Sequence, residues 1–317
     1  MSTAARVPET WELDGDDARR TLAETGRMRL LRDAFTRFRA ADGTSHSRSL
    51  AFTVSLVLVE SLVVVVGFAA AFETSSITST IVETIRSAVP GPASDVLADA
   101  VKQANKVGGD NRFLPLVIGL VGMLATATTA MAQMERGLNR IYGVEQDRPT
   151  AEKYRLAFLL TLTVGTFLGV AFLLLGFGRS IGSAWGRDAR VTWEILRWPI
   201  GLVLIAVALA LLLRYSANRR QPGRAWLAFG AGVAVVLWAA STIALALVFR
   251  LSSSFGDTYG PLAGVIALLL WTFVSSFSIF YGVAVAAQLE SIRSGSGAAR
   301  DPAKAAPAPV DGEMARA

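Results

Sequence analysis

Residues 225–249 read AWLAFGAGVAVVLWAASTIALALVF, and residues 261–287 read PLAGVIALLLWTFVSSFSIFYGVAVAA. Neither stretch contains a charged residue, and each is longer than the roughly 18 apolar residues that mark a membrane-crossing helix. A water-soluble protein of this size would instead space its apolar residues at the helical or strand period. The two stretches therefore predict a protein whose helices lie within a lipid bilayer.

The composition of the whole chain agrees with a membrane protein. Of its 317 residues, 52% are hydrophobic and only 18% are charged, and the mean hydropathy is +0.45. We predict an all-α integral membrane protein, a bundle of six transmembrane helices. Each predicted span can cross a hydrocarbon core of about 30 Å at about 1.5 Å per residue. The spans are residues 49–72, 113–134, 155–177, 193–213, 226–250 and 260–289.

The residue types that catalysis and metal binding need are scarce. The chain has no cysteine, and its only histidine is His46, so thiolate chemistry is excluded and clustered metal ligands are not expected. A Walker A motif is absent as well, which argues against ATP hydrolysis. We therefore expect no catalytic residues, no metal and no cofactor, and we predict that the protein is not an enzyme.

The net charge of +6 could indicate a nucleic-acid partner, but membrane proteins keep lysine and arginine in their cytoplasmic loops. Arginines are concentrated before the first span and in the second-to-third and fourth-to-fifth connections. We therefore predict a multi-pass protein of the cell (plasma) membrane with both termini in the cytoplasm. Membrane lipids, not nucleic acid, are the expected partners.

Three regions lie outside the membrane domain of residues 49–292. Residues 1–48 predict a cytoplasmic segment with a basic amphipathic helix, which lies either on an anionic membrane surface or in solvent. The first exoplasmic loop predicts two short amphipathic helices that cap the bundle, with Ser94 as the N-cap of the second. Residues 293–317 are rich in Gly, Ser, Pro and Ala and predict a disordered cytoplasmic tail.

One face of the second span carries small and hydroxyl residues and then becomes cationic. Gly143 follows this stripe and suits the left-handed position after a helix. The stripe indicates either close helix packing that ends in topology-setting arginines or a polar pathway that leads to an acidic head group. The residues of the stripe are Gly119, Gly122, Thr126, Thr129, Gln133, Arg136 and Arg140. For the second interpretation, the head-group candidates are Arg136, Arg140, Arg219 and Arg220.

Glu60 lies near the middle of the first span, with Thr53 and Gly67 on the same helical face. An ionisable group at that depth costs several kcal/mol unless it is paired, hydrated or protonated. Glu60 is thus either a structural acid bonded to a neighbouring helix or part of a substrate pathway. The pathway candidates are Glu60, Thr53, Thr126, Thr129 and Gln133.

Three motifs resemble a known family. LNRIYGVEQDRP follows the second span, LLRYSANRRQPGRAW precedes the fifth, and TYGPLAGVIALLLW opens the sixth. Together, over about residues 49–292, they resemble the YihY/BrkB family of bacterial inner-membrane proteins, which includes YhjD-like members. This chain departs from the pattern of the family in two places. It lacks the proline that many relatives have in the first span, and it lacks the carboxylate and the asparagine that relatives tend to have in the sixth. We interpret Glu60 as a replacement for that carboxylate.

The resemblance implies a six-helix domain with cytoplasmic termini and a role in envelope integrity or in moving lipid-like molecules. We therefore expect a transporter or flippase for an amphiphilic, anionic envelope component. The first alternative is a structural or scaffolding membrane protein that moves nothing. The second is a ribonuclease, a label that parts of the family have carried, which the lack of clustered His or Asp ligands disfavours.

Overall fold

The structure, a computed structural model, describes residues 2–10, 15–71, 79, 82–83, 85–86, 89, 91–107, 113–183, 187–221, 224–251, 259 and 262–305. Across these residues all the elements are helices, and the only β pairing is an isolated bridge between Ala4 and Arg300. The all-α prediction is therefore confirmed.

Six helices of the described chain are long and apolar enough to cross a membrane. They correspond one to one to the six predicted spans, so the prediction of a six-helix bundle is confirmed. They are α3 (Gly43–Ala71), α6 (Leu114–Tyr142), α7 (Thr150–Ser183), α8 (Arg187–Ser216), α9 (Arg224–Leu251) and α11 (Leu262–Arg293).

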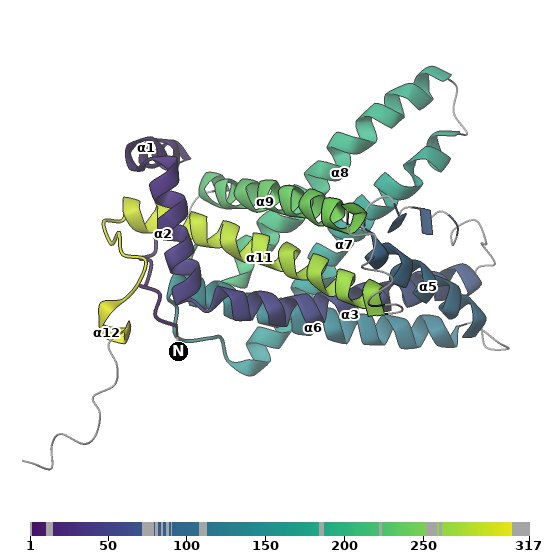
Figure 1. The fold of residues 1–317 in the computed structure, drawn as a ribbon, viewed down its shortest axis with the longest axis horizontal. Coiled ribbons are helices and arrows are strands. Elements are labelled where there is room, and N and C mark those ends of the chain that lie inside the picture. The colour runs from purple at the N-terminus through teal and green to yellow at the C-terminus, as the bar shows by residue number, and fades with distance from the viewer. Residues whose placement is uncertain are drawn as a thin grey trace, which may run out of the picture.

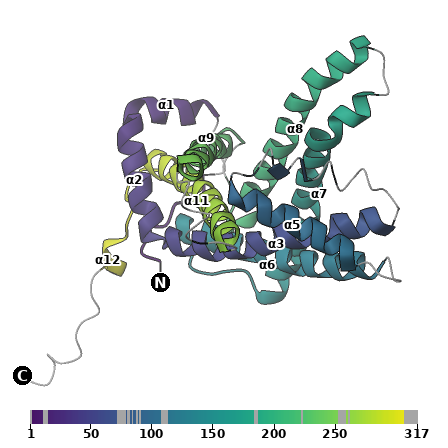
Figure 2. The same cartoon turned by 45° about the vertical axis from the view of Figure 1, so that its right-hand side comes forward.

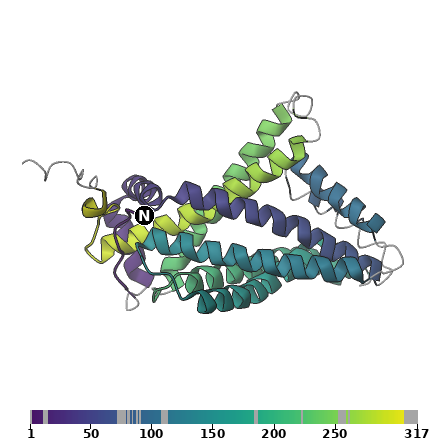
Figure 3. The same cartoon turned by 90° about the horizontal axis from the view of Figure 1, so that it is seen from below.

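The spanning helices form two groups that meet at one end. Helices α3 and α6 run side by side, α11 packs against α3 and α9, and α7 forms a hairpin with α8 beside α6. The α7–α8 hairpin diverges from α9 and α11 with distance from the chain termini (Figures 1 and 2). Seen from below, α3 and α6 run antiparallel and come closer together away from the N-terminus (Figure 3). Many large apolar side chains of α7 and α8 are exposed, as expected for surfaces that face lipid.

The described N-terminal residues 2–10 and C-terminal residues 294–305 lie at one end of the bundle, which we call the terminal end (Figure 1). The backbone N–H of Asp301 donates to the carbonyl of Thr3, at 2.8 Å. Helix α12 (Pro302–Ala305) follows directly. Residues 294–305, the first part of the predicted tail, are thus held against the N-terminal segment, whereas 306–317 lie outside the described residues.

The predicted N-terminal helix is two helices. Gly26, with φ of 81°, separates α1 (Gly15–Thr25) from α2 (Arg27–Ala40), because a residue in that conformation interrupts the helix. Leu30 is buried in a cluster that includes Trp226 of α9 and Leu289 of α11. Much of the apolar face of these N-terminal helices therefore packs on the bundle, while Phe35 remains 45% exposed.

The end of the bundle away from the termini is covered by α5 (Pro92–Val107). It buries Leu97 and Val101 against Leu62 of α3 and Ala267 of α11. The prediction of Ser94 as an N-cap is wrong, because the helix begins two residues earlier, at proline. The other short helix expected in this loop falls mostly outside the described residues.

Candidate functional site

Polar side chains join α3 to α6 in two separate clusters. The Thr126 hydroxyl donates to Glu60 Oε1 at 3.0 Å. Nearer the terminal end, the hydroxyls of Thr53 and Ser49 donate to Gln133 Oε1 at 3.1 and 3.2 Å. The structure thus brings four of the five pathway candidates together in pairs. The fifth, Thr129, donates to the carbonyl of Ala125 on its own helix.

Glycines on α6 allow these contacts because they let α3 approach closely. A Cβ at Gly119 would lie 3.0 Å from a methyl of Val63, and one at Gly122 would lie 3.3 Å from Glu60 Oε1. The carboxyl of Glu60 is thus enclosed by α6. Its Oε1 bonds to Thr126, but its buried Oε2 has no hydrogen-bond partner among the described residues.

At the terminal end, α6 stops at Gly143, whose φ of 69° gives the left-handed cap that its sequence predicts. Asn139, in the last turn, then ties two loops together. Its amide donates to Asp147 Oδ1 at 2.9 Å, and its Oδ1 accepts the backbone N–H of Asn218 at 2.7 Å. Burial acts to raise the pKa of Asp147, but the hydrogen bond from Asn139 and the charge of Lys153 outweigh it. The pKa therefore falls below the ordinary value of 3.8.

Arg148 clamps the end of α8 to the start of α7. Its guanidinium donates to the carbonyls of Ser216 and Ala217, each at 3.0 Å. It also forms an ion pair with the buried carboxylate of Glu135 at 3.1 Å. These carbonyls belong to the end of a helix, where backbone acceptors lack intrahelical partners. The clamp therefore fixes the α8–α9 loop relative to α7.

Arg219, in the α8–α9 loop, is bound from three sides. Its Nη2 lies 2.5 Å from Glu290 Oε1 on α11, and both side chains are almost fully buried. It also donates to the carbonyl of Pro8 at 2.9 Å. Its guanidinium carbon lies 4.5 Å from the ring centroid of Tyr142, within the range of a cation–π contact.

Arg37 of α2 is a second buried arginine at this end. It donates to Gln288 Oε1 at 2.8 Å and to the carbonyls of Ala5 and Ala298 at 2.7 and 2.6 Å. Burial lowers the pKa of Arg37 to about 10, against the opposing influence of Tyr142 and Glu290. Its many acceptors show how such a charge is accommodated: hydrogen bonds replace the water that burial removes.

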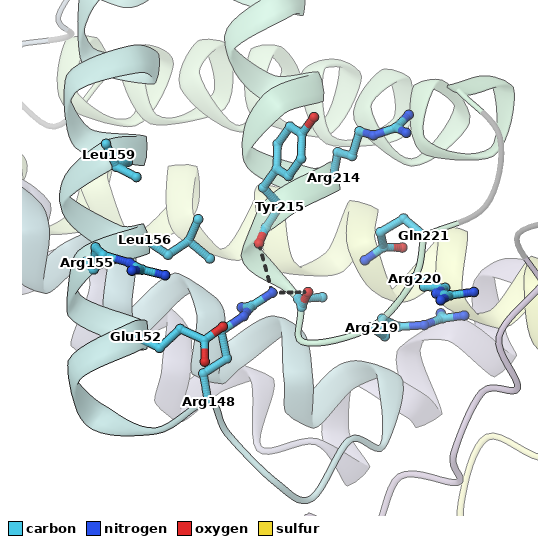
Figure 4. Close-up of a pocket in the computed structure, with 11 residues that line it drawn as sticks. Arg148, Glu152, Arg155, Leu156, Leu159, Arg214, Tyr215, Arg219, Arg220 and Gln221 are labelled. Atoms are coloured by element: carbon cyan, nitrogen blue, oxygen red, sulfur yellow. Dashed lines mark hydrogen bonds between the residues drawn. The ribbon is translucent and has the colours of Figure 1, made fainter.

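A pocket of about 540 Å³ opens beside Arg219, between the start of α7, the end of α8 and the α8–α9 loop (Figure 4). Five arginines and one glutamate supply its charged lining, and two leucines of α7 form an apolar side. The lining residues are Arg148, Glu152, Arg155, Leu156, Leu159, Arg214, Tyr215, Ala217, Arg219, Arg220 and Gln221.

Only two of the five arginines that line the pocket form ion pairs with carboxylates of the described residues. Arg148 and Arg219 are already paired with carboxylates. By contrast, no salt bridge in the described part of the chain includes the other three arginines. Those three are Arg155, Arg214 and Arg220, all exposed.

Two buried polar groups of the pocket also lack partners among the described residues. They are Nε of Arg219 and both amide atoms of Gln221. Buried polar atoms are nearly always hydrogen-bonded to protein or to ordered water. The N–H donors of Arg219 and Gln221 could therefore be satisfied by water or by an anionic ligand in the pocket, and Oε1 of Gln221, an acceptor, by water.

The four predicted head-group arginines are divided by the structure. Arg219 and Arg220 line the pocket, whereas Arg136 and Arg140 do not. Sequence reasoning missed Arg148, Arg155 and Arg214, because it used them only to orient the chain. A signal was present: consecutive spans joined by a short connection run antiparallel, so Arg155 at the start of one and Arg214 at the end of the next must meet at one end.

Groups of His, Cys, Asp or Glu that could hold a metal ion are absent from the residues that the structure describes. What the pocket offers is fixed positive charge beside an apolar helix face. This arrangement suits binding of an anionic group.

Comparisons with known proteins identify relatives among bacterial membrane proteins. The family model described as virulence factor BrkB matches residues 34–308. The ribonuclease-like protein YfkH of Bacillus subtilis (strain 168) is 25% identical over 263 residues, 80% of this chain and 93% of that protein. No solved structure matches.

Two other relatives are longer than the part they share with this chain. A UPF0761 membrane protein of Pseudomonas aeruginosa (strain LESB58) is 28% identical, over 56% of this chain and 43% of that protein. The UPF0761 membrane protein Rru_A2625 of Rhodospirillum rubrum is 28% identical, over 76% of this chain and 54% of that protein. This chain thus spans about half the length of these two relatives.

Proposed function

We propose, from the premise that this chain belongs to the BrkB family of membrane proteins, that it moves an amphiphile with an anionic head group across the membrane. It acts as a transporter or flippase for a lipid-like envelope component and so contributes to envelope integrity. Membrane lipids are its partners, and it is not an enzyme.

The arginine pocket is the observation that carries this proposal. Arg155, Arg214 and Arg220 supply charge without carboxylate partners, and Arg is well suited to phosphate and carboxylate groups. Leu159 of α7 lines the same pocket and is 51% exposed, so an acyl chain can leave the pocket along an apolar helix face. The polar clusters of α3 and α6, with Glu60, Thr53, Thr126 and Gln133, are the candidate path through the membrane.

The terminal end is the cytoplasmic end in this proposal. Its connections carry most of the arginines, as the positive-inside rule requires of cytoplasmic loops. The pocket then opens at the cytoplasmic leaflet of the cell membrane, which is rich in anionic lipid. An anionic amphiphile would enter from that side.

A scaffolding protein that moves nothing is the main alternative, and the buried arginine network of the terminal end favours it, because such a network rigidifies the bundle. The name of the Bacillus relative raises a ribonuclease as a further candidate. We do not favour it, because the described residues supply no cluster of metal ligands and the pocket lining includes no histidine.

The test compares purified variants in liposomes that contain a fluorescent anionic lipid. The triple variant Arg155→Gln, Arg214→Gln, Arg220→Gln should bind the fluorescent anionic lipid on the order of 100-fold more weakly than wild type. Each lost arginine removes about 1 kcal/mol of binding free energy. The loss should shrink at high salt because of screening. Arg250→Gln, on the exposed end of α9 away from the termini, is the matched control and should bind as wild type does.

Two outcomes would separate the candidates. Arg136→Gln with Arg140→Gln should weaken binding less than the triple variant, because these arginines lie outside the pocket lining. Undiminished binding in the triple variant would contradict the proposed site. Binding without any translocation by wild type would support the scaffold instead.

A further inference from the structure

Glu60 presents a problem of charge that the arginine pocket does not explain. Its partner Thr126 lies near the middle of α6 (Leu114–Tyr142), so the carboxyl lies near the middle of a helix that is long and apolar enough to cross a membrane. An ionised carboxylate there would have one hydroxyl donor for Oε1 and none for the buried Oε2. Such a charge without a cationic partner is among the most expensive groups to bury.

No cation compensates this carboxylate within the described residues. Helix α3 packs against α6, α11 and α5, and none of the charged residues of those helices forms an ion pair or hydrogen bond with Glu60 in that part of the chain. The described charged side chains lie at the helix ends or on the exposed side of α5: Glu135, Arg136 and Arg140 of α6, Glu290 and Arg293 of α11, Asp95 and Asp99 of α5. The side chains of Lys102 and Lys106, also of α5, lie outside the described residues.

We propose that the Glu60 carboxyl is a proton-binding site at the centre of the membrane, occupied in the resting protein. With the proton on Oε1, the acid donates to Thr126 Oγ1 across the observed 3.0 Å. Only a carbonyl oxygen, Oε2, then lacks a donor, which costs far less than a bare charge.

The proton can exchange with the terminal end of the bundle. On that side of Glu60 the α3–α6 contact continues with Gln133, which accepts from Thr53 and Ser49. On exchange, the O–H bond of Glu60 breaks and the proton passes to a water molecule as hydronium, leaving the carboxylate. The reverse step restores the neutral acid. The inference does not depend on the proposed transport of an anionic amphiphile.

Infrared difference spectroscopy of the full chain in liposomes tests the site. At pH 7 an exposed glutamate is ionised, since its ordinary pKa is about 4.3, so a protonated-carboxyl C=O band at that pH marks an unusual acid. The band should be present in wild type, absent in Glu60→Gln, and shifted in Thr126→Val, which keeps the shape but loses the hydroxyl. Ser55→Ala, which removes a different interhelical hydrogen bond, to Thr272, should leave the band unchanged.

The proposal is overturned if Glu60→Gln at pH 7 loses a carboxylate band and no protonated-acid band, because Glu60 would then be ionised in wild type. If Glu60→Gln fails to insert, Thr126→Val decides: a shifted band supports the proposal, and an unshifted band overturns it. Replacing water by deuterium oxide adds a second measurement. The C=O band should move as the proton exchanges, and Gln133→Leu should slow that change.

Discussion

Arg219 and Glu290 form an ion pair between the α8–α9 loop and α11, with Nη2 and Oε1 2.5 Å apart and only 2% and 1% of their side chains exposed. The pair also binds the N-terminal segment, because Thr10 donates to Glu290 Oε1 at 2.5 Å and Pro8 accepts from Arg219. Arg219, which lines the pocket, is therefore held in place by two distant parts of the chain, α11 and the N-terminal segment.

Glu290→Gln should destabilise the protein strongly, because it leaves the guanidinium of Arg219 buried without a counter-charge. Loss of one partner from a buried pair costs about 3–5 kcal/mol. Thermal unfolding in detergent measures the effect. Asp17→Asn is the control, since it removes the more exposed pair with Arg293, which is worth at most about 1 kcal/mol. Equal losses in the two variants would contradict a special role for the buried pair.

The helices could be predicted from the sequence much better than the site. An uncharged block such as residues 225–249 identifies a span whatever its neighbours are. The stripe of the second span likewise gave the face on which Thr126 and Gln133 lie. It could not give their partners, because helical periodicity says which face is polar but not which helix covers it.

Of the arginines that line the pocket, the sequence predicted only Arg219 and Arg220 as head-group candidates, for a related reason. Arg219 bonds to Glu290, 71 residues further along the chain, and no local pattern reports that distance. The arginines of the connections were interpreted as topology signals, and that reading is compatible with binding. Only the packing of α7 on α8 separates Arg155 and Arg214, which line the pocket, from Arg136 and Arg140, which do not.

The hydrogen bonds of Asn139 to Asp147 and Asn218 link the α6–α7 loop to the α8–α9 loop. We expect this link to weaken only when the pH falls low enough to protonate Asp147. The pKa of Asp147 is lowered in the folded protein, so ionised Asp147 contributes stability above its unfolded value of 3.8. That contribution disappears as the pH falls through the lower, folded value. Asp147→Asn should therefore reduce the unfolding temperature at pH 7 and come closer to wild type near pH 3. A difference that does not change with pH would contradict this reading.

The orientation of the chain can be tested with reporter fusions. Insertions in residues 215–224 and fusions at the C-terminus should report from the cytoplasm, and insertions in residues 90–110 from the other side. The reason is the excess of arginine at the terminal end. A C-terminal reporter outside the cell would contradict the proposed orientation.

Two glycines of different surroundings give a matched test of the packing between the helices. A Cβ at Gly282 of α11 would lie 2.5 Å from the carbonyl oxygen of Gly230 on α9, whereas one at Gly165 of α7 would meet nothing within 4 Å. Gly282→Ala must therefore push α9 from α11 and should cost about 1–3 kcal/mol of stability. Gly165→Ala should be neutral or stabilising by up to about 1 kcal/mol, since alanine favours the helix.

Thermal unfolding of the two variants in the same detergent compares them directly. Gly165 and Gly169 form the GxxxG pattern GTFLG, which by sequence alone predicts a packing face, yet both face open space in this chain. If Gly165→Ala proves as harmful as Gly282→Ala, a neighbour must cover that face of α7. Cross-linking at this position in the membrane would then show whether the neighbour is a second copy of the chain.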